Sequence, residues 1–274
     1  MNNPRFSTII LAGDRGQGDP VAGLAQVSGK SIVPLAGIPM IVRVIEAIEA
    51  SNMAGEIRIC GPARPTISEC PALQNIINAQ RVEWVPPGDS PCNSVAACID
   101  RISGTDPVFI TTADHGLLSP DMIAYFLNES AITNADATVG LVDYQTIISA
   151  YPDSRRTRLK FQNGNYCGCN LFTMFNQSGK DLVSLWKQVE EHRKQPFRIL
   201  NRLLGPIRTI FYILGKLTLE EALLSLEEKY SINTRAIILP YPTAGIDIDT
   251  VADLHLAESI LSAPAATGAG SRHD

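Results

Sequence analysis

The chain has 274 residues, of which 45% are hydrophobic and 19% charged, and its formal net charge is −5. This hydrophobic content suffices for one large α/β domain or two small ones and excludes disorder for most of the chain. Because the chain has no basic excess, we expect no nucleic-acid partner. Residues 1–5 are short and polar, unlike a secretory signal, so we predict a cytoplasmic protein.

The six cysteines are scattered, with no C-x-x-C pair and no histidine at zinc-ligand spacing. We expect reduced thiols, since a chain of this length without a secretory signal rarely depends on disulfides. Cys167 and Cys169 form the one close pair, and on a strand this spacing places both on one face. We interpret them as packing residues.

The first predicted element is a β-branched run at residues 8–11, which ends at Gly13 and leads towards Lys30. Such a run, bounded by glycine, is typical of a buried parallel strand. Gly13, Gly16 and Gly18 then allow sharp turns and expose backbone N–H groups, which suits an anion. We interpret this loop as a cradle for nucleotide phosphates, with an ordinary βα loop as the alternative.

Spacing separates this loop from two common phosphate-binding motifs. Residues 13–18 follow the order G-x-x-G-x-G, whereas a dinucleotide fingerprint needs G-x-G-x-x-G. Between Gly23 and Gly29 there are five residues, whereas a Walker A loop has four at that place. Neither motif is therefore present.

The following elements alternate between helix and strand. Apolar residues recur at helical spacing over 41–50, and strands are expected at 57–60, 82–85 and 108–112. This rhythm predicts βαβ units and a parallel sheet. A proline-rich loop precedes a further helix, for which Asn93 or a neighbour is the expected N-cap.

Asp114 directly follows the most apolar strand of the first half. Open α/β sheets bind ligands at the carboxyl ends of their strands, so a carboxylate there is well placed to meet a metal ion. The alternative is a helix cap, but Ser119 already fits that role for a helix at 121–127. We predict that Asp114 is a metal ligand.

A strand at 137–142 precedes a strongly basic segment and a hairpin with its turn at Asn163-Gly164. We interpret the basic residues either as a site for the phosphate of an acceptor or as protective charges on an edge strand. They are Arg155, Arg156, Arg158 and Lys160.

Residues 178–230 have helical patterns, and 199–214 are unusually apolar. Arg202, Pro206 and Arg208 interrupt the apolar run, which disfavours a transmembrane helix. We expect this run to be buried under the sheet or in a subunit contact such as a homodimer. A helix that lies on a membrane surface, as a peripheral contact, is the alternative.

The last strand is expected at 236–239, ahead of two carboxylates, Asp247 and Asp249. Thr250 then caps a closing helix through residue 261. Residues 262–274 are of low complexity and are expected to be disordered.

Three segments occur in the order found in nucleotidyltransferases of the glycosyltransferase-A-like fold, and the chain resembles that family. It is most similar to the molybdenum-cofactor guanylyltransferase-like and sugar-phosphate cytidylyltransferase-like groups. Departures from the family pattern are Asp14 and Gly18, where the family has Gly and Arg, Gly116, where it has Pro, and Val251 and Ala252 after the last segment. The three segments are Leu11-Ala12-Gly13 with Lys30 and Gly37-Ile38-Pro39-Met40, the residues around Asp114, and Asp247-Ile248-Asp249-Thr250.

The resemblance implies an α/β fold, a Rossmann-like three-layer sandwich with a mostly parallel mixed sheet. One NTP-transferase domain would span 1–261, with an apolar helical insertion at about 178–230. The implied reaction is Mg²⁺-dependent transfer of an NMP from an NTP to a small phosphorylated or hydroxyl acceptor, with release of pyrophosphate. The alternatives are a glycosyltransferase of the same fold that uses a nucleotide sugar, and a degenerate protein that binds nucleotide without catalysis.

The resemblance also implies roles for individual residues. Lys30 and Arg15 would act on the phosphates as catalytic cations. The metal ligands would be Asp114 and either Asp249 or Asp247. The nucleotide-binding residues would be Leu11, Ala12, Gly13, Asp14, Gly16, Gly88, Ser94 and Asp114. The acceptor-binding residues would be Arg155, Arg156, Arg158, Gly168 and Asn170.

Overall fold

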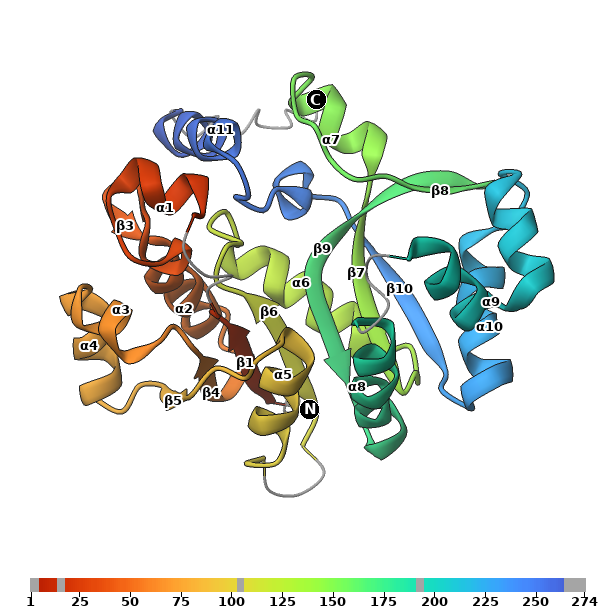
Figure 1. Ribbon diagram of the computed structural model, residues 1–274, viewed down its shortest axis with the longest axis horizontal. Helices are drawn as coiled ribbons and strands as arrows, with labels where there is room; N and C mark the ends of the chain where they lie inside the picture. Colours follow the sequence, from red (N-terminus) through yellow and green to blue (C-terminus); the bar gives the residue numbers. More distant parts are fainter. Residues whose placement is uncertain (1–4, 14–17, 103–105, 191–194, 264–274) are drawn as a thin grey trace, which may run out of the picture.

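A computed structural model describes residues 5–13, 18–102, 106–190 and 195–263, and its centre is one large sheet (Figure 1). The order across this sheet is β10-β7-β9-β6-β1-β4-β5, and β8 pairs with the start of β9. A separate small hairpin consists of β2 (Pro34–Leu35) and β3 (Ile38–Pro39). The strands of the large sheet are β1 (Phe6–Leu11), β4 (Ala54–Cys60), β5 (Glu83–Val85), β6 (Val108–Thr112), β7 (Ala137–Asp143), β8 (Leu159–Phe161), β9 (Gly164–Met174) and β10 (Thr234–Leu239).

Within the large sheet, β9 runs antiparallel to β6, β7 and β8, while the other neighbouring strands pair in parallel. β1 lies between β4 and β6, so the chain fills the sheet on one side of β1 and then returns to the other side. The predicted α/β class with a mostly parallel mixed sheet is confirmed. Parallel strands need cover on both faces, which explains their nearly continuous apolar runs.

Helices cover both faces of the sheet, and this makes the three layers. α5 and α8 pack on one face, and α2 and α6 on the other (Figure 1). The α-helices are α1 (Pro20–Ala25), α2 (Met40–Ala50), α3 (Arg64–Ser68), α4 (Pro71–Asn78), α5 (Pro91–Ile99), α6 (Pro120–Ala131), α7 (Tyr144–Ala150), α8 (Gln177–Glu190), α9 (Pro196–Ile213), α10 (Leu219–Tyr230) and α11 (Val251–Ser262). The short 3₁₀ helices are η1 (Lys30–Ile32) and η2 (Pro242–Gly245).

The core follows the apolar spacing of the sequence. On α2, Ile41, Val44, Ile45 and Ile48 are all fully buried against the sheet, as the i, i+3, i+4, i+7 pattern predicts. All six cysteines are free and buried, which agrees with the expectation of reduced thiols that serve packing.

The N-cap of α5 lies three residues before Asn93, around which it was expected. Ser90, not Asn93, is the N-cap, and its hydroxyl accepts a hydrogen bond from the backbone N–H of Asn93 at 3.2 Å. Both residue types are good caps, so their identity alone did not distinguish them. Pro91 at the first helical position marks the true start, because proline is favoured there.

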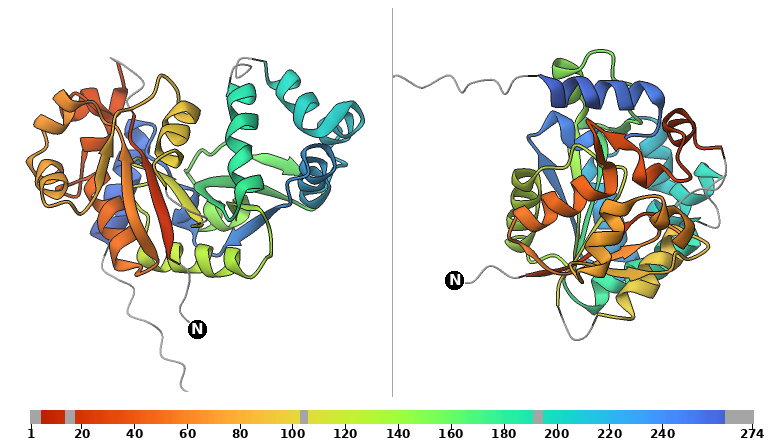
Figure 2. Two further views of the ribbon diagram at one scale, coloured as in Figure 1. Left: turned by 90° about the horizontal axis from the view of Figure 1, so that it is seen from below. Right: turned by 90° about the vertical axis from the view of Figure 1, so that its left-hand side faces the viewer.

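The helices α9 and α10 form the side of the molecule away from α1 to α4, as two perpendicular views show (Figures 1 and 2). α9 is kinked at Gly205, whose φ of 78° is not helical. Several large apolar side chains after the kink are exposed, so the expected burial beneath the sheet is wrong for this part. Among the described residues, every helix is too short or too polar to cross a membrane.

Candidate active site

The candidate site lies at the carboxyl end of the parallel strands. The loop after β6 is tied to the end of β1, because the backbone N–H of Ala113 donates to the carbonyl of Leu11 at 2.9 Å. The loop before α11 joins them, since the N–H of Ile248 donates to the carbonyl of Asp114 at 3.1 Å. These loops meet where strand order reverses about β1, the usual place for a ligand in an open α/β sheet.

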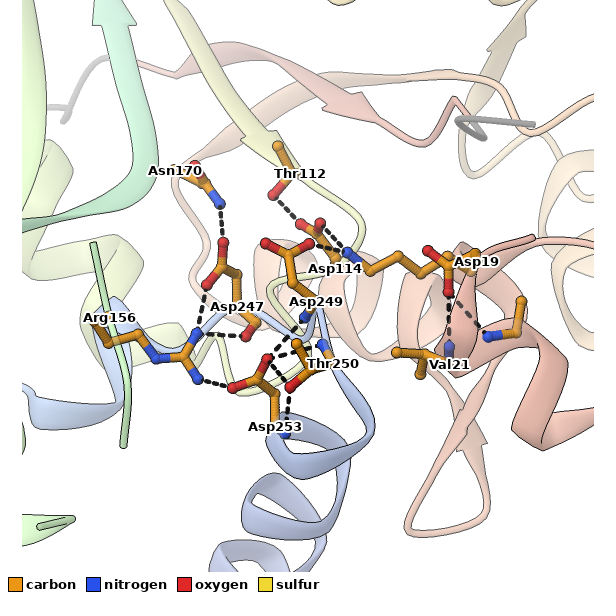
Figure 3. A network of polar contacts seen from close by, with 12 residues as sticks. Asp19, Val21, Thr112, Asp114, Arg156, Asn170, Asp247, Asp249, Thr250 and Asp253 are labelled. Carbon is orange, nitrogen blue, oxygen red and sulfur yellow. Dashed lines mark hydrogen bonds and ion pairs between the residues drawn. The ribbon is translucent and has the colours of Figure 1, made fainter. Parts of the chain in front are cut away.

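Lys30, at the start of η1, reaches across this edge to two carboxylates. Its Nζ lies 2.7 Å from Oδ2 of Asp114 and 2.5 Å from Oδ1 of Asp249. The hydroxyl of Thr112 donates to the other oxygen of Asp114 at 2.6 Å, which fixes that carboxylate (Figure 3). The structure thus brings together three residues that the sequence analysis singled out, and it adds Thr112, which the analysis missed.

In this cluster, each charged group favours the ionised form of its partner. Burial lowers the pKa of Lys30, but the charges and hydrogen bonds of Asp114 and Asp249 outweigh burial, so the pKa is raised above its usual value. Burial likewise raises the pKa of the Asp114 carboxyl, but the charge and hydrogen bond of Lys30 reverse this and hold it below its usual range. Both side chains are therefore charged at neutral pH.

Asp247 belongs to a second, adjoining network (Figure 3). The guanidinium of Arg156 donates to the carboxylate of Asp247 at 2.7 Å and to its main-chain carbonyl at 2.9 Å, and it also pairs with Asp253. The side-chain amide of Asn170 lies 3.5 Å from the other oxygen of Asp247. Asp253 in turn forms a capping box with Thr250 at the start of α11.

We expect Arg156→Ala to lower the free energy of unfolding by about 2–3 kcal/mol, because the Arg156 side chain is 7% exposed and its loss leaves two carboxylates without their cation. Chemical denaturation of the variant measures this loss. Arg155→Ala, a change at the exposed neighbouring position, is the matched control and should stay within about 0.5 kcal/mol of the wild type. Equal stability of the two variants would contradict the structural role of Arg156.

Negative charge is concentrated where the two networks meet. Burial raises the pKa of Asp247, and the nearby carboxylates of Asp249 and Asp114 raise it further, while Arg156 opposes them. In the parts of the chain that the structure describes, no group of three or more His, Cys, Asp or Glu side chains is arranged to hold a metal ion. The ammonium of Lys30 lies between Asp114 and Asp249 instead. The carboxylate oxygens of Asp114 and Asp249, which both contact the Lys30 ammonium, are nevertheless of the kind that a hard ion such as Mg²⁺ prefers.

Gly88, in the loop after β5, and Ser94, in the first turn of α5, come together on the same edge of the sheet. The N–H of Gly88 donates to the hydroxyl of Ser94 at 3.0 Å. A Cβ on Gly88 would lie 2.9 Å from the backbone nitrogen of Ser94, so only glycine fits without a shift. Gly13, after β1, is near this loop, because a Cβ there would lie 3.9 Å from Cβ of Pro87.

The predicted acceptor residues separate into two groups. Arg156 is engaged by carboxylates, whereas Arg155 and Arg158 are exposed, with the guanidinium of Arg158 4.8 Å from the ring centre of Tyr144. Gly168 lies in open space on β9, two residues before Asn170, which contacts Asp247. The position of Gly168 on β9 is thus unobstructed.

The remaining residues predicted for the nucleotide site belong to the first loop, and the structure describes only some of them. Of the first loop, Leu11 and Ala12 are at the end of β1, with Ala12 buried at 3% exposure. Asp14, Arg15 and Gly16 lie outside the described residues. His115, next to Asp114, is 1% exposed, and burial lowers its pKa to about 4, so it is a neutral core residue at pH 7.

The fold and this edge together define an α/β domain of the nucleotidyltransferase type, in which a lysine after β1 meets carboxylates after β6 and before the last helix. Residues 8–199 match the family described as the MobA-like NTP transferase domain. The chain therefore belongs to the MobA-like NTP transferase family, and the resemblance stated from the sequence is confirmed.

Several solved structures share the fold of this chain. A hypothetical transferase from Thermus thermophilus superposes with a TM-score of 0.74 at 24% identity, over 91% of this chain and 99% of that one. CMP:2-keto-3-deoxy-manno-octonic acid synthetase complexed with CTP gives 0.58 at 12% identity, over 94% and 98%. 4-Diphosphocytidyl-2C-methyl-D-erythritol synthase from Anaerococcus prevotii gives 0.56 at 11% identity, over 96% and 100%. Among proteins of curated function, none matches the sequence.

Proposed function

We propose that the protein is a nucleotidyltransferase that transfers an NMP from an NTP to a small phosphorylated or hydroxyl acceptor and releases pyrophosphate. The observation that carries the proposal is the Lys30 ammonium held between Asp114 and Asp249 at the carboxyl edge of the sheet. Membership of the NTP transferase family supports it. So does the fold shared with a synthetase that binds CTP.

In this reaction an acceptor oxygen attacks the α-phosphorus as the bond to the bridging oxygen of the β-phosphate breaks, and pyrophosphate leaves with both electrons of that bond. Charge develops on the phosphate oxygens, so the protein needs positioning and cations rather than a covalent nucleophile. Lys30 is the cation that this chain offers for the leaving phosphates. Gly13 and the loop after β1 would hold them through backbone N–H groups.

Asp114 and Asp249 would hold Mg²⁺, which supplies positive charge to the phosphate oxygens when it is bound. Asp249 is favoured over Asp247 as the second ligand, because it shares a cation with Asp114 while Asp247 contacts Arg156 and Asn170. Without Mg²⁺, the single positive charge of Lys30 offsets part of the negative charge of the two carboxylates. It thereby reduces their mutual repulsion.

The acceptor would bind over β9, where a Cβ on Gly168 would meet no atom within 4 Å and where Asn170, two residues further on, contacts Asp247. We expect Arg155→Ala and Arg158→Ala to raise the KM for a phosphorylated acceptor by roughly 10- to 100-fold in at least one case, because Arg forms charge-assisted hydrogen bonds to phosphate. Steady-state kinetics at saturating NTP measure this effect. The KM for the NTP should not change.

Arg235→Ala, on the outer strand β10, is the matched control for these variants, since Arg235 is also an exposed arginine. If neither Arg155→Ala nor Arg158→Ala changes the acceptor KM, the basic segment is a charged edge strand and not a binding site.

The proposed activity is tested by incubating the protein with each of the four NTPs, Mg²⁺ and a panel of sugar phosphates and other phosphorylated acceptors. We expect pyrophosphate release with one preferred NTP and a rise in Tm with that NTP alone. A Tm shift without pyrophosphate release across the panel would favour the degenerate nucleotide-binding protein. A parallel incubation supplies nucleotide sugars in place of the NTPs, and their turnover without pyrophosphate release would instead identify a glycosyltransferase.

A further inference from the structure

The second half of α9 has its apolar and polar sides reversed. Helices on the surface of a domain in water normally turn apolar residues inward and polar residues outward. Here Thr209 is fully buried and Arg208 pairs with Glu228 of the neighbouring helix. The exposed side carries five large apolar residues of this half and its C-cap, each 45–68% exposed, namely Ile207, Ile210, Phe211, Ile213 and the cap residue Leu214. We call these five residues the apolar face of α9.

This face is a local feature and not a general property of the surface. Of the twelve exposed large hydrophobic side chains in the described part of the chain, five form the apolar face and a sixth, Phe197, is on the first half of the same helix. Contiguous exposed apolar surface of this kind marks an interaction site.

The apolar face is held rigidly to the sheet. The ring of Phe161 on β8 packs on Tyr212 with 5.5 Å between ring centres. The N–H of Gln162 donates to the carbonyl of Leu217 at 2.8 Å. The β8–β9 hairpin therefore holds this part of α9 in place, so its outward side cannot turn inward without breaking these contacts.

The charges within the segment that carries the apolar face indicate which partner it suits. Residues 192–219 contain six Lys or Arg and no Asp or Glu, while the rest of the chain has 17 basic and 28 acidic residues and a net charge of −11. An apolar stripe with flanking cations fits a surface that is both apolar and anionic, as in a bilayer with acidic lipids. A second copy of this segment would instead bring like charges together.

We propose that α9 docks the protein onto a membrane that contains anionic lipids, with its apolar face in the interfacial layer and Arg198, Arg202 and Lys216 near the headgroups. This goes beyond the transferase activity and does not depend on it. Arg202 and Lys216 are both exposed, and a flexible cation can reach headgroups while its stem covers apolar surface.

The proposal is tested by co-sedimentation of the full chain with phosphatidylcholine vesicles that do or do not contain phosphatidylglycerol. We expect sedimentation with the anionic vesicles and release by high salt. The triple variant Ile207→Ser, Ile210→Ser, Phe211→Ser should bind these vesicles at least about 10-fold more weakly, because it removes three large apolar side chains from the contact.

Ile132→Ser is the matched control, because Ile132 is 73% exposed but lies directly after α6, away from the basic segment. It should bind vesicles as the wild type does. We expect the triple variant to fold, since the changed side chains point outward. Its circular dichroism spectrum and its Tm check this. Its pyrophosphate release in solution should also be unchanged, so that failure of membrane docking and failure of the transferase proposal are distinguishable.

Two results would overturn the proposal. One is a wild-type protein that stays in the supernatant with anionic vesicles. The other is a wild-type dimer in light scattering that the triple variant converts to a monomer without any vesicle binding, because the apolar face would then be a contact between two copies of this chain.

Discussion

Asp114→Asn is expected to reduce Mg²⁺-dependent NMP transfer by on the order of 1000-fold or more, because a metal ion supplies several kcal/mol of charge stabilisation in such transfers. A neutral amide is a poor ligand for a hard cation. Folding should survive, since the amide oxygen of Asn can still accept the hydrogen bond from Thr112. The measurement is pyrophosphate release as a function of Mg²⁺ concentration, together with the Tm of the variant.

Asp249→Asn should be impaired to a similar degree, because Asp249 shares the Lys30 ammonium with Asp114. Asp121→Asn, at an exposed position in the first turn of α6, is the control for loss of an aspartate charge and should retain activity. If Asp247→Asn is inactive while Asp249→Asn is active, the second ligand is Asp247. Full activity of Asp114→Asn would refute the assignment of the metal site.

Lys30→Ala is expected to lower turnover by on the order of 100-fold or more, if the ammonium stabilises charge that develops on the leaving phosphates. We expect a second effect of this substitution that does not depend on turnover. Without the Lys30 ammonium, Asp114 and Asp249 repel each other and have no cation between them. We therefore expect Mg²⁺ alone to raise the Tm of Lys30→Ala more than that of the wild type.

Lys216→Ala, an exposed lysine after α9, is the control for loss of one positive charge and should show wild-type turnover in solution. Wild-type turnover of Lys30→Ala would remove the lysine from the mechanism. An equal Mg²⁺ response in Lys30→Ala and the wild type would show that metal and ammonium do not compete for these carboxylates.

The sequence by itself determined the strands, their parallel rhythm and the edge at which the site lies. These features depend on local apolar periodicity and on a general property of parallel sheets, whose strand ends gather loops from distant parts of the chain. Asp114 was predicted at this edge for that reason, and Lys30 was named through the resemblance to the family; the structure places the two in contact. The prediction that Thr250 caps α11 also depended only on neighbouring residues, and it is confirmed.

The tertiary structure alone decided how the charges pair and which surfaces stay exposed. Asp249 rather than Asp247 meets Lys30, over a separation of 219 residues, and Arg156 is engaged by Asp247 over 91 residues. No local pattern specifies such pairs, because each depends on loops that the sheet brings together. The outward apolar face of α9 is likewise a tertiary result: an apolar run in sequence does not show which side of a helix its neighbours will cover.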